Sequence, residues 1–311
     1  MFLLKAQPRF LSYLLMKRKY NSLGDASKKM KTDNQNKNFE HKFISWNVNG
    51  IRALWNKESG NYLLNLVSEH NPTIIGLQET KLQAELESNF SNILTGYTAY
   101  FNSCTSKKGY SGTAVYISNK VQPISVSKGI GIEKHDIEGR SITVELQECY
   151  LIITYVPNSG KNFERLDYRS KEWDVDMKKY ILGLQEKKPV VWAGDFNIAL
   201  EDIDAHKQKA NQNTDQEKIL LQELMNKNHF IDAFRYLYPT KPNCFTYWVS
   251  VTYLTVTNVT KGYIGNMRNK DKGWRVDHFF VSEHLKDKVH DCFILKDHMG
   301  SDHCPIGLVL K

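Results

Sequence analysis

Short apolar runs alternate with longer amphipathic stretches from Lys42 to the end of the chain. Runs rich in β-branched and aromatic residues predict buried strands, whereas apolar residues at helical spacing predict helices that pack on them. Strands are predicted at 42–47, 73–78, 97–102, 112–118, 141–146, 150–155, 189–194, 245–249, 276–281 and 305–310. Helices are predicted at 58–69, 164–187 and 215–228. We therefore expect one α/β domain with two packed mixed sheets and helices outside them.

Polar side chains stand at the ends of several predicted strands. They are carboxylates, amides and one imidazole: Asn47, Asn49, Glu79, Asp195, Asn197, Asp277, Asp302 and His303. Each one alone is typical of a turn or a helix cap. As a set they indicate one site at the edge of the sheets. Oxygen ligands with a single His, and no Cys or His cluster, suit a hard cation such as Mg2+ rather than zinc.

The composition is that of a large globular domain. The chain has 311 residues, of which 41% are apolar and 12% aromatic, enough for a sizeable core. No apolar run approaches the roughly 18 residues of a spanning helix, so we expect no membrane contact. The five cysteines are scattered and odd in number, which predicts reduced thiols and an intracellular compartment. We expect Cys304 to pack beneath the site rather than to act as a nucleophile.

The net charge of +8 lies mainly in the N-terminal extension. Residues 1–40 hold nine of the 42 basic residues and three of the 34 acidic ones, so residues 41–311 carry only +2. Any DNA-binding surface on the larger part must therefore be a local patch. We expect residues 1–40 to be a targeting segment plus linker and residues 41–311 to be the catalytic domain.

The extension has the composition of a mitochondrial presequence. It has no acidic residue before Asp25, and its spaced bases are separated by apolar residues at helical spacing. A nuclear signal in Lys28-Lys29-Met30-Lys31 and a nucleic-acid-binding arm are the alternatives. We expect a mitochondrial location, a nuclear location, or both.

The motifs FISWNVNGIRA, IIGLQETKL, GYSGTAVY, EGRSITVE, ITYVPNSG, GDFNIA, FTYW, GWRVDHFFVS and GSDHCPI follow one another in this order. The chain resembles the exonuclease III-type apurinic/apyrimidinic (AP) endonucleases over residues 42–311. This resemblance implies a deoxyribonuclease I-like fold, which is a four-layer α/β sandwich of two packed mixed β-sheets flanked by helices. It also implies a monomer that acts on double-stranded DNA containing abasic sites.

The activity implied by the resemblance is that of a Mg2+-dependent DNA-(apurinic or apyrimidinic site) endonuclease of base excision repair. Such an enzyme cuts 5′ to the abasic site and leaves a 3′-hydroxyl and a 5′-deoxyribose phosphate; 3′-phosphodiesterase and 3′-5′ exonuclease activity would use the same site. The alternatives are another superfamily phosphoesterase, such as a phosphatase or deadenylase, and a nucleic-acid-binding relative with impaired catalysis.

The resemblance also implies roles for single residues. Glu79 would be the principal ligand of Mg2+, or of Mn2+ in its place, with Asn49 and Asp302 beside it. Asp195 would orient or deprotonate the attacking water, fixed by Asn47 and Asn197. His303, held by Asp277, would contact the scissile phosphate.

Further contacts to the phosphate and the DNA are implied in the same way. Tyr155 would supply a hydroxyl and Asn158 an amide to the phosphate, although a strand-end Tyr and a turn Asn are the ordinary interpretations. Residues that would bind DNA are Arg52, Tyr110, Lys161 and Asn211 on the backbone, and Tyr247 and Trp274 as walls of an abasic-sugar pocket. Because an abasic nucleotide lacks stacking and pairing, it flips out at lower cost than a normal one.

Two loops depart from the family pattern. The segment AHKQKANQNTDQEK after GDFNIALEDID is shorter than the usual loop, and Asn211 lies within it. Residues 249–261, VSVTYLTVTNVTK, are thirteen extra residues beside the expected pocket. Their Val/Thr-rich composition predicts an extended β-hairpin. The other explanation, which we favour, is translated intron sequence, since Val-Ser can be encoded by the splice-donor sequence GTAAGT.

Overall fold

The computed structural model describes residues 40–206, 215–227, 229–248, 250–252 and 263–311. Its first sheet has the strand order β13-β14-β1-β2-β4-β3. These strands are β1 (His41–Asn47), β2 (Ile74–Gln78), β3 (Tyr97–Asn102), β4 (Thr113–Ser118), β13 (Val289–Ile294) and β14 (Ile306–Leu310). β1 and β2 run parallel, whereas the other neighbours are antiparallel. The sheet is therefore mixed, as predicted.

The second sheet has the order β5-β6-β7-β8-β12-β9. Its strands are β5 (Ser125–Lys128), β6 (Ser141–Glu145), β7 (Tyr150–Tyr155), β8 (Val190–Asp195), β9 (Phe230–Asp232) and β12 (Asp277–Ser282). Only β7 and β8 are parallel among its neighbouring pairs. Each sheet thus contains one parallel pair, and the carboxyl ends of both pairs carry predicted site residues.

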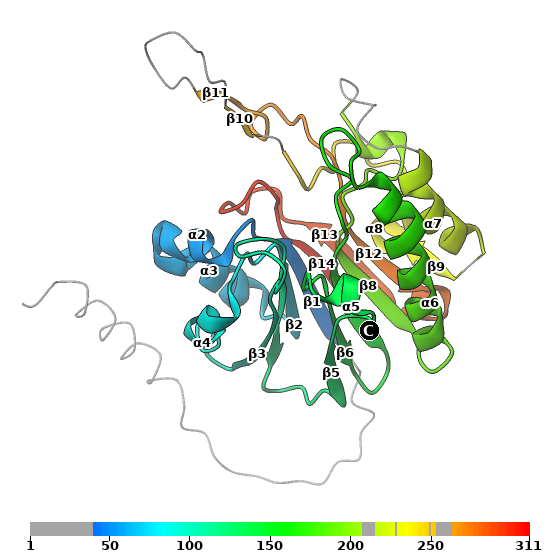
Figure 1. The fold of residues 1–311 in the computed structure, drawn as a ribbon, viewed down its shortest axis with the longest axis horizontal. Helices are drawn as coiled ribbons and strands as arrows, with labels where there is room; N and C mark the ends of the chain where they lie inside the picture. The colour runs from blue at the N-terminus through cyan, green and yellow to red at the C-terminus, as the bar shows by residue number, and fades with distance from the viewer. Residues whose placement is uncertain (1–39, 207–214, 228, 249, 253–262) are drawn as a thin grey trace, which may run out of the picture. The chain divides into compact units, whose positions relative to one another are not determined.

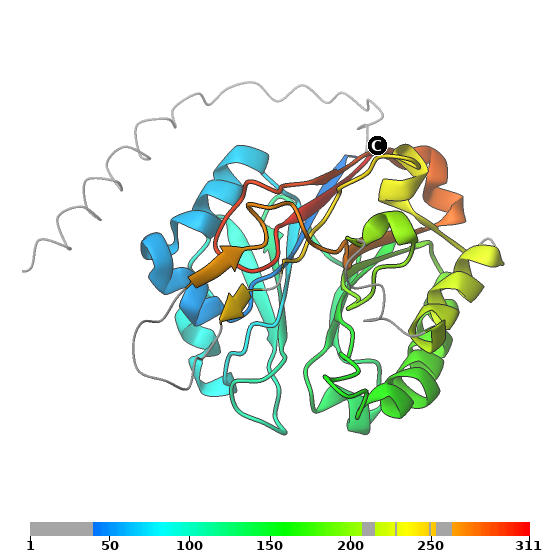
Figure 2. The same cartoon turned by 90° about the horizontal axis from the view of Figure 1, so that it is seen from above.

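The two sheets pack face to face around one apolar core (Figure 2). Phe43, Ile74 and Val115 from the first sheet meet Ile153 and Val191 from the second. These β-branched and aromatic side chains suit a pleated, fully buried surface. A Cβ at Gly76 would lie 2.4 Å from Cδ1 of Ile153, so the glycine in β2 lets the two sheets approach closely.

Helices cover the outer face of each sheet (Figures 1 and 2). Outside the first sheet lie α2 (Ile51–Asn56), the 3₁₀ turn η1 (Lys57–Gly60), α3 (Asn61–His70) and α4 (Glu87–Phe90); outside the second lie the π-helix η3 (Tyr168–Trp173), α6 (Asp174–Gln185) and α7 (Asp215–Asn226). Apolar residues of these helices pack on the sheets, Leu63 of α3 near Ile44 and Met177 of α6 near Trp192. This helix–sheet–sheet–helix order confirms the predicted four-layer sandwich.

The shorter elements are the 3₁₀ turns η2 (Ala84–Leu86), η4 (Asp202–Asp204) and η6 (Glu283–Lys288), and the helices α5 (Glu133–Asp136) and α8 (Ala233–Leu237). Every helix in the part of the chain that the structure describes falls short of the length and apolarity needed to cross a bilayer.

The strand predicted at 245–249 is wrong. Tyr247 forms only isolated bridges, with Trp274 and His303, because the backbone N–H groups of Thr246 and Tyr247 both donate to the carbonyl of Trp274. The helix predicted from residue 164 begins at Leu166 instead, and its π-helical part η3 begins at Tyr168. The preceding residues fold back as a loop, in which Arg165 N donates to the carbonyl of Ser159.

The strands β5, β9 and β13 were not predicted. β5 is mostly exposed and β9 has three residues, so neither carries a readable apolar pattern. β10 (Ser250–Thr252), within the extra segment, pairs antiparallel with β11 (Tyr263–Asn266), which follows that segment. The remainder of residues 249–261, and Asn211, lie outside the described residues.

Candidate active site

Asn47 joins the two sheets at the edge where the parallel strands end. It is the last residue of β1 and is fully buried. Its Nδ2 donates to Glu79 Oε1 at 3.0 Å and to Asp195 Oδ2 at 2.8 Å. Glu79 directly follows β2, and Asp195 ends β8. The carboxyl ends of both parallel pairs therefore meet at one site, where the sequence predicted that the strand ends would converge.

Several residues of this site have left-handed backbone conformations. The φ angles are 46° at Asn49, 49° at Glu79 and 54° at Asn197. Such conformations are uncommon for residues other than glycine and gather at functional sites, where surrounding contacts hold them. Gly194, with φ of 143°, precedes Asp195, and a Cβ there would lie 1.8 Å from the carbonyl oxygen of Thr154. These turns aim the polar side chains into the site.

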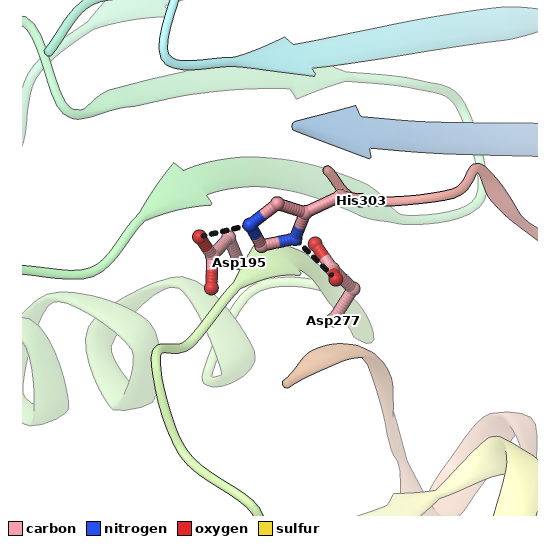
Figure 3. A group of neighbouring side chains, drawn as sticks. All are labelled: Asp195, Asp277 and His303. Atoms are coloured by element: carbon pink, nitrogen blue, oxygen red, sulfur yellow. Dashed lines mark hydrogen bonds and ion pairs between the residues drawn. The ribbon is translucent and has the colours of Figure 1, made fainter. Parts of the chain in front are cut away.

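The imidazole of His303 lies between two carboxylates (Figure 3). Its Nδ1 is 2.8 Å from Asp277 Oδ2, and its Nε2 is 3.8 Å from Asp195 Oδ2. Asp277 begins β12, which runs antiparallel to β8 and pairs Asp277 with Asp195. This register places the two carboxylates side by side, and all three residues are buried.

Burial and neighbouring charges shift the pKa values of this group. Burial lowers the pKa of His303, but the charges of Asp277 and Asp195 outweigh it and raise the pKa to about 10. For Asp195, burial raises the pKa; His303 opposes this and Asp277 adds to it. Burial raises the pKa of Tyr155 well above its usual value, and the Glu79 carboxylate adds to this. The site therefore favours a protonated imidazole and a carboxylate of raised basicity.

Glu79 and Asn49 already share a cation in this structure. The ammonium of Lys81 lies 2.7 Å from Glu79 Oε2 and 2.5 Å from Asn49 Oδ1, and Asn49 Nδ2 donates to Asp302 Oδ1 at 3.0 Å. Burial raises the pKa of Glu79, but Lys81, Asn47 and His303 together outweigh it, so the net pKa is lowered. The three predicted metal ligands thus lie together, and the ammonium acts as a stand-in ion that shows the position suits a cation.

A second group of possible ligands lies beside the first. Single ligand atoms of Asp195, Asp277 and His303 lie within 4.8 Å of one another. Because the imidazole already bridges these two carboxylates, we regard Glu79 and its neighbours as the better cation position. Either way, the residues present form an acidic cluster that is able to hold a divalent metal.

The two predicted phosphate contacts lie next to this cluster. Tyr155 ends β7, with its ring 4.8 Å from the buried guanidinium of Arg140. Asn158 Nδ2 donates to Asn197 Oδ1 at 2.9 Å, and Asn197 Nδ2 donates to the carbonyl of Val156 at 2.9 Å. A hydrogen bond between the side chains of Asn158 and Asn197 therefore connects the turn after β7 with the turn after β8.

Tyr247 lies beside the imidazole, and Trp274 lies beside Tyr247. The Tyr247 ring centroid is 4.6 Å from that of His303 and 6.0 Å from that of Trp274. Trp274 is 6% exposed and packs with Ala199 and Val276, so it is more deeply buried than a simple pocket wall. The structure brings both aromatic residues to the site, with the Tyr247 ring against the imidazole of His303.

The other predicted DNA contacts lie outside the buried cluster. Arg52, on α2, and Lys161, in the loop after β7, are exposed. The hydroxyl of Tyr110 accepts from Arg140 Nη2 at 2.8 Å and from Arg165 Nη1 at 2.5 Å. Because Arg140 Nη1 also donates to the carbonyl of Tyr155 at 3.1 Å, Tyr110 is linked through Arg140 to the strand that carries Tyr155.

Three basic residues near the site were not singled out from the sequence. Lys81 and Arg140 lie inside the recognised motifs, two residues after Glu79 and in EGRSITVE, so their position was a usable signal. Arg169 lies in a charged stretch of the predicted helix and gave no such signal, yet it is almost fully buried.

A carboxylate–imidazole–carboxylate set next to a cation position, on a sandwich of two mixed sheets, defines a hydrolase suited to phosphate esters. The chain belongs to the endonuclease/exonuclease/phosphatase family, whose profile matches residues 44–303.

Proteins of similar sequence carry names that describe them as nucleases acting on DNA. An exodeoxyribonuclease of Bacillus subtilis (strain 168) is 40% identical over 274 residues, which cover 87% of this chain and 99% of the relative. The DNA repair nuclease APEX1 of Danio rerio is 39% identical over 274 residues, covering 86% and 82%. The DNA-(apurinic or apyrimidinic site) endonuclease of Dictyostelium discoideum is 38% identical over 280 residues, covering 86% and 70%.

Solved structures of other proteins have a fold similar to that of this chain. The AP endonuclease of Leishmania major superposes with a TM-score of 0.74 at 28% identity, covering 99% of both chains. The catalytic domain of Xenopus laevis APE2 gives a TM-score of 0.71 at 25% identity, covering 87% of this chain and 91% of that one. The resemblance to the AP endonucleases and the predicted fold are confirmed.

Proposed function

We propose that the protein is a monomeric, Mg2+-dependent AP endonuclease of base excision repair. It cuts the phosphodiester 5′ to an abasic site and leaves a 3′-hydroxyl and a 5′-deoxyribose phosphate. The observation that carries this proposal is the hydrogen-bonded set around Asn47, which places Glu79 and the Asp195–His303–Asp277 group at one site. Relatives at 38–39% identity are named as AP-site and DNA repair nucleases.

Asp195 is the group that takes a proton from the attacking water. Its Oδ2 accepts from Asn47 Nδ2, and its Oδ1 accepts from Asn197 N at 2.8 Å, so the carboxylate has one orientation. Because burial raises its pKa, it is a stronger base than an exposed aspartate near neutral pH. Asn197 and Asn47 act as positioning residues for this step.

His303 neutralises charge on the phosphate. Asp277 keeps the imidazole protonated, so Nε2 donates a charge-assisted hydrogen bond to a phosphoryl oxygen as negative charge develops. The hydroxyl of Tyr155 and the amide of Asn158 donate to the same phosphate. Since Nε2 faces Asp195 across 3.8 Å, the base and the phosphate-binding group act on the same small volume.

Glu79, Asn49 and Asp302 would hold the metal, and Mg2+ fits their oxygen donors. When bound there, the ion would supply Lewis-acid stabilisation of the phosphoryl and leaving oxygens. Lys81 must then release Glu79 and Asn49, because its ammonium lies on the oxygens that the ion needs.

Tyr247 and Trp274 form the apolar side of the pocket for the flipped abasic sugar. The Tyr247 ring lies next to His303, and the Trp274 ring lies next to Tyr247, so an extruded sugar that packs on them presents its 5′ phosphate to the imidazole. Extrusion costs least for a nucleotide without a base. Arg52, Lys161 and Tyr110 hold the flanking backbone.

Exonuclease action at 3′ ends is a second activity of the same site. It is favoured because the relative from Bacillus subtilis, 40% identical over nearly its whole length, is named an exodeoxyribonuclease. No additional residue is required, since a 3′-terminal nucleotide offers the same phosphodiester to Asp195 and His303.

The test uses the full chain and duplexes that carry one tetrahydrofuran abasic analogue, with Mg2+ or with EDTA. We expect nicking 5′ to the analogue only with Mg2+, and a product whose 3′-hydroxyl a DNA polymerase extends. Tight binding without nicking would instead indicate a nucleic-acid-binding relative. Release of phosphate from a 3′-phosphorylated end without nicking would indicate a phosphatase.

A further inference from the structure

A buried arginine lies behind the active site. Arg169 is the second residue of the π-helix η3 and is 2% exposed. Its Nη1 donates to the carbonyl of Pro157 at 3.1 Å, and its Nη2 donates to the carbonyl of Phe196 at 2.8 Å. These two carbonyls belong to the turns after β7 and β8. One guanidinium therefore connects the two turns.

Each carbonyl belongs to the peptide group of a predicted site residue. The Pro157 carbonyl is in the peptide that precedes Asn158, and the Phe196 carbonyl is in the peptide that precedes Asn197. In a trans peptide the C=O and N–H point in opposite directions. The N–H of Asn197 therefore points away from Arg169, and it donates to Asp195 Oδ1 at 2.8 Å.

A chain of hydrogen bonds thus runs from the guanidinium to the catalytic carboxylate. Arg169 donates to the Phe196 carbonyl, and the same peptide donates its N–H to Asp195. A positive charge on the carbonyl side polarises the peptide and strengthens its N–H as a donor. Both ends of this chain are buried, so water screens it little.

Carboxylates hold the guanidinium in place. Glu217, on α7, is 3% exposed, and its Oε1 lies 3.5 Å from Arg169 Nη1 and accepts from Ser159 Oγ at 2.6 Å. Asp174 Oδ2 lies 4.0 Å from Arg169 Nε. Burial raises the pKa of Asp174 to about 6, and Arg169 opposes this rise. Glu217 and Ser159 also tie the turn after β7 to the same guanidinium.

Helix packing alone does not explain a buried charge here. Trp173 of the same π-helix and Met177 of α6 already pack on the apolar outer face of the second sheet. A buried ion pair is often no more stabilising than apolar residues of similar size. What an apolar side chain lacks is the pair of donors that fix two carbonyls, and π-helical turns are frequent at functional sites.

We propose that Arg169 is a positioning residue for phosphodiester hydrolysis, which fixes the peptides before Asn158 and Asn197 and through them the Asp195 carboxylate. This inference rests on the proposed role of Asp195. Arg169 touches no substrate. Its loss should slow the chemical step and leave DNA binding nearly unchanged.

The test compares Arg169→Lys and Arg169→Met with the wild type in single-turnover cleavage of the abasic-analogue duplex. Lysine keeps the charge but has a single donor centre in place of the guanidinium fork. We expect the cleavage rate constant to fall about tenfold for Arg169→Lys and about a hundredfold for Arg169→Met, with duplex affinity in EDTA changed less than about twofold. Lys171→Met is the matched control, because Lys171 lies in the same helix but is exposed and pairs with Asp167.

A double-mutant cycle separates positioning from general damage. In an Asn158→Ala background, Arg169→Lys should cost clearly less than it does in the wild type, because the Asn158 amide, one of the two groups that Arg169 would position, is gone while both carbonyls remain. Wild-type rates for Arg169→Lys, or equal losses in rate and affinity with fully additive effects, would overturn the proposal. If Arg169→Met does not fold, Arg169→Lys and the cycle still decide it.

Failure of the proposed function is detected separately. The same variants are assayed on undamaged duplex for 3′-5′ degradation. If the wild type degrades this DNA but does not nick at the analogue, the AP endonuclease proposal fails, while the Arg169 comparison is made on the exonuclease reaction. If the wild type cleaves neither substrate, both proposals fail.

Discussion

Nδ1 of His303 lies 2.8 Å from Oδ2 of Asp277, and both side chains are buried. The raised pKa of His303, about 10 against an ordinary value of 6.5, makes this pair pH-dependent. Its stabilisation is complete below the ordinary His pKa and is lost as pH rises through 10. We therefore predict that Asp277→Asn lowers the free energy of unfolding by about 3–5 kcal/mol near pH 6, and by much less near pH 10.

Urea denaturation at the two pH values measures this difference. Asp287→Asn is a suitable control, because this acid lies in the surface turn η6, away from His303. A cost of Asp277→Asn that is the same at both pH values would show that the imidazole carries no extra proton in the folded protein.

Metal binding should depend on the charge of Glu79. We predict that Glu79→Gln raises the Mg2+ concentration for half-maximal cleavage by about tenfold or more, whereas Asn49→Asp lowers it, because affinity for a hard cation follows the charge of its ligands. Calorimetric titration with Mg2+ in the absence of DNA gives a readout independent of activity. Glu69→Gln, which alters an exposed acid on α3, should leave both measurements unchanged. An equal Mg2+ requirement in all four proteins would place the metal elsewhere.

Selectivity for the abasic site should depend on Tyr247, because its ring lies 4.6 Å from that of His303. We predict that Tyr247→Ala lowers the ratio of abasic-site nicking to degradation of undamaged duplex by about tenfold, within the range for loss of apolar pocket contacts. Trp274→Phe, which keeps an aromatic ring in a mostly buried position, should change the ratio less. If Tyr247→Ala lowers both activities in proportion, the pocket assignment is wrong.

The sequence predicts the framework well because nearly every long strand is a β-branched or aromatic run buried on both faces, as in β2 and β8. It also predicts that Asn47, Glu79 and Asp195 come together, because they stand where those runs end. It predicts less well what depends on long-range contacts. Residues 245–249 have the pattern of a strand, but the N–H groups of Thr246 and Tyr247 bond to the Trp274 carbonyl and that of Trp248 to the Asp302 carbonyl instead.

The burial of an arginine is the second feature that the sequence does not predict. Arg169 lies in a charged stretch that is typical of an exposed helix face, and nothing local shows that distant carbonyls accept its hydrogen bonds. Arg169 receives its burial from α7 and from the turns after β7 and β8, which are 12 or more residues away along the chain. Only the folded arrangement reveals such a residue.

The extra segment 249–261 should be dispensable for cleavage. The site contacts around it come from Tyr247, Trp248 and Trp274, which flank it: Trp248 N donates to the Asp302 carbonyl at 3.0 Å, and Trp274 N to the Tyr247 carbonyl at 3.0 Å. We predict that a variant lacking residues 249–261 nicks the abasic analogue at least as fast as the full chain, and that the mature transcript lacks these codons. A transcript that retains them would rule out the intron explanation. A deletion variant that binds but no longer cleaves would assign the segment a functional role.

The most direct measurement concerns Asp195, on which the proposed chemistry depends. Asp195→Asn keeps the shape of the side chain and removes the base. In single-turnover experiments with the tetrahydrofuran duplex and Mg2+, we expect the cleavage rate constant to fall by about 10²–10⁴-fold. Affinity for the same duplex, measured in the same samples, should stay within a few-fold of the wild type. Cleavage by Asp195→Asn at a rate near that of the wild type would contradict the account.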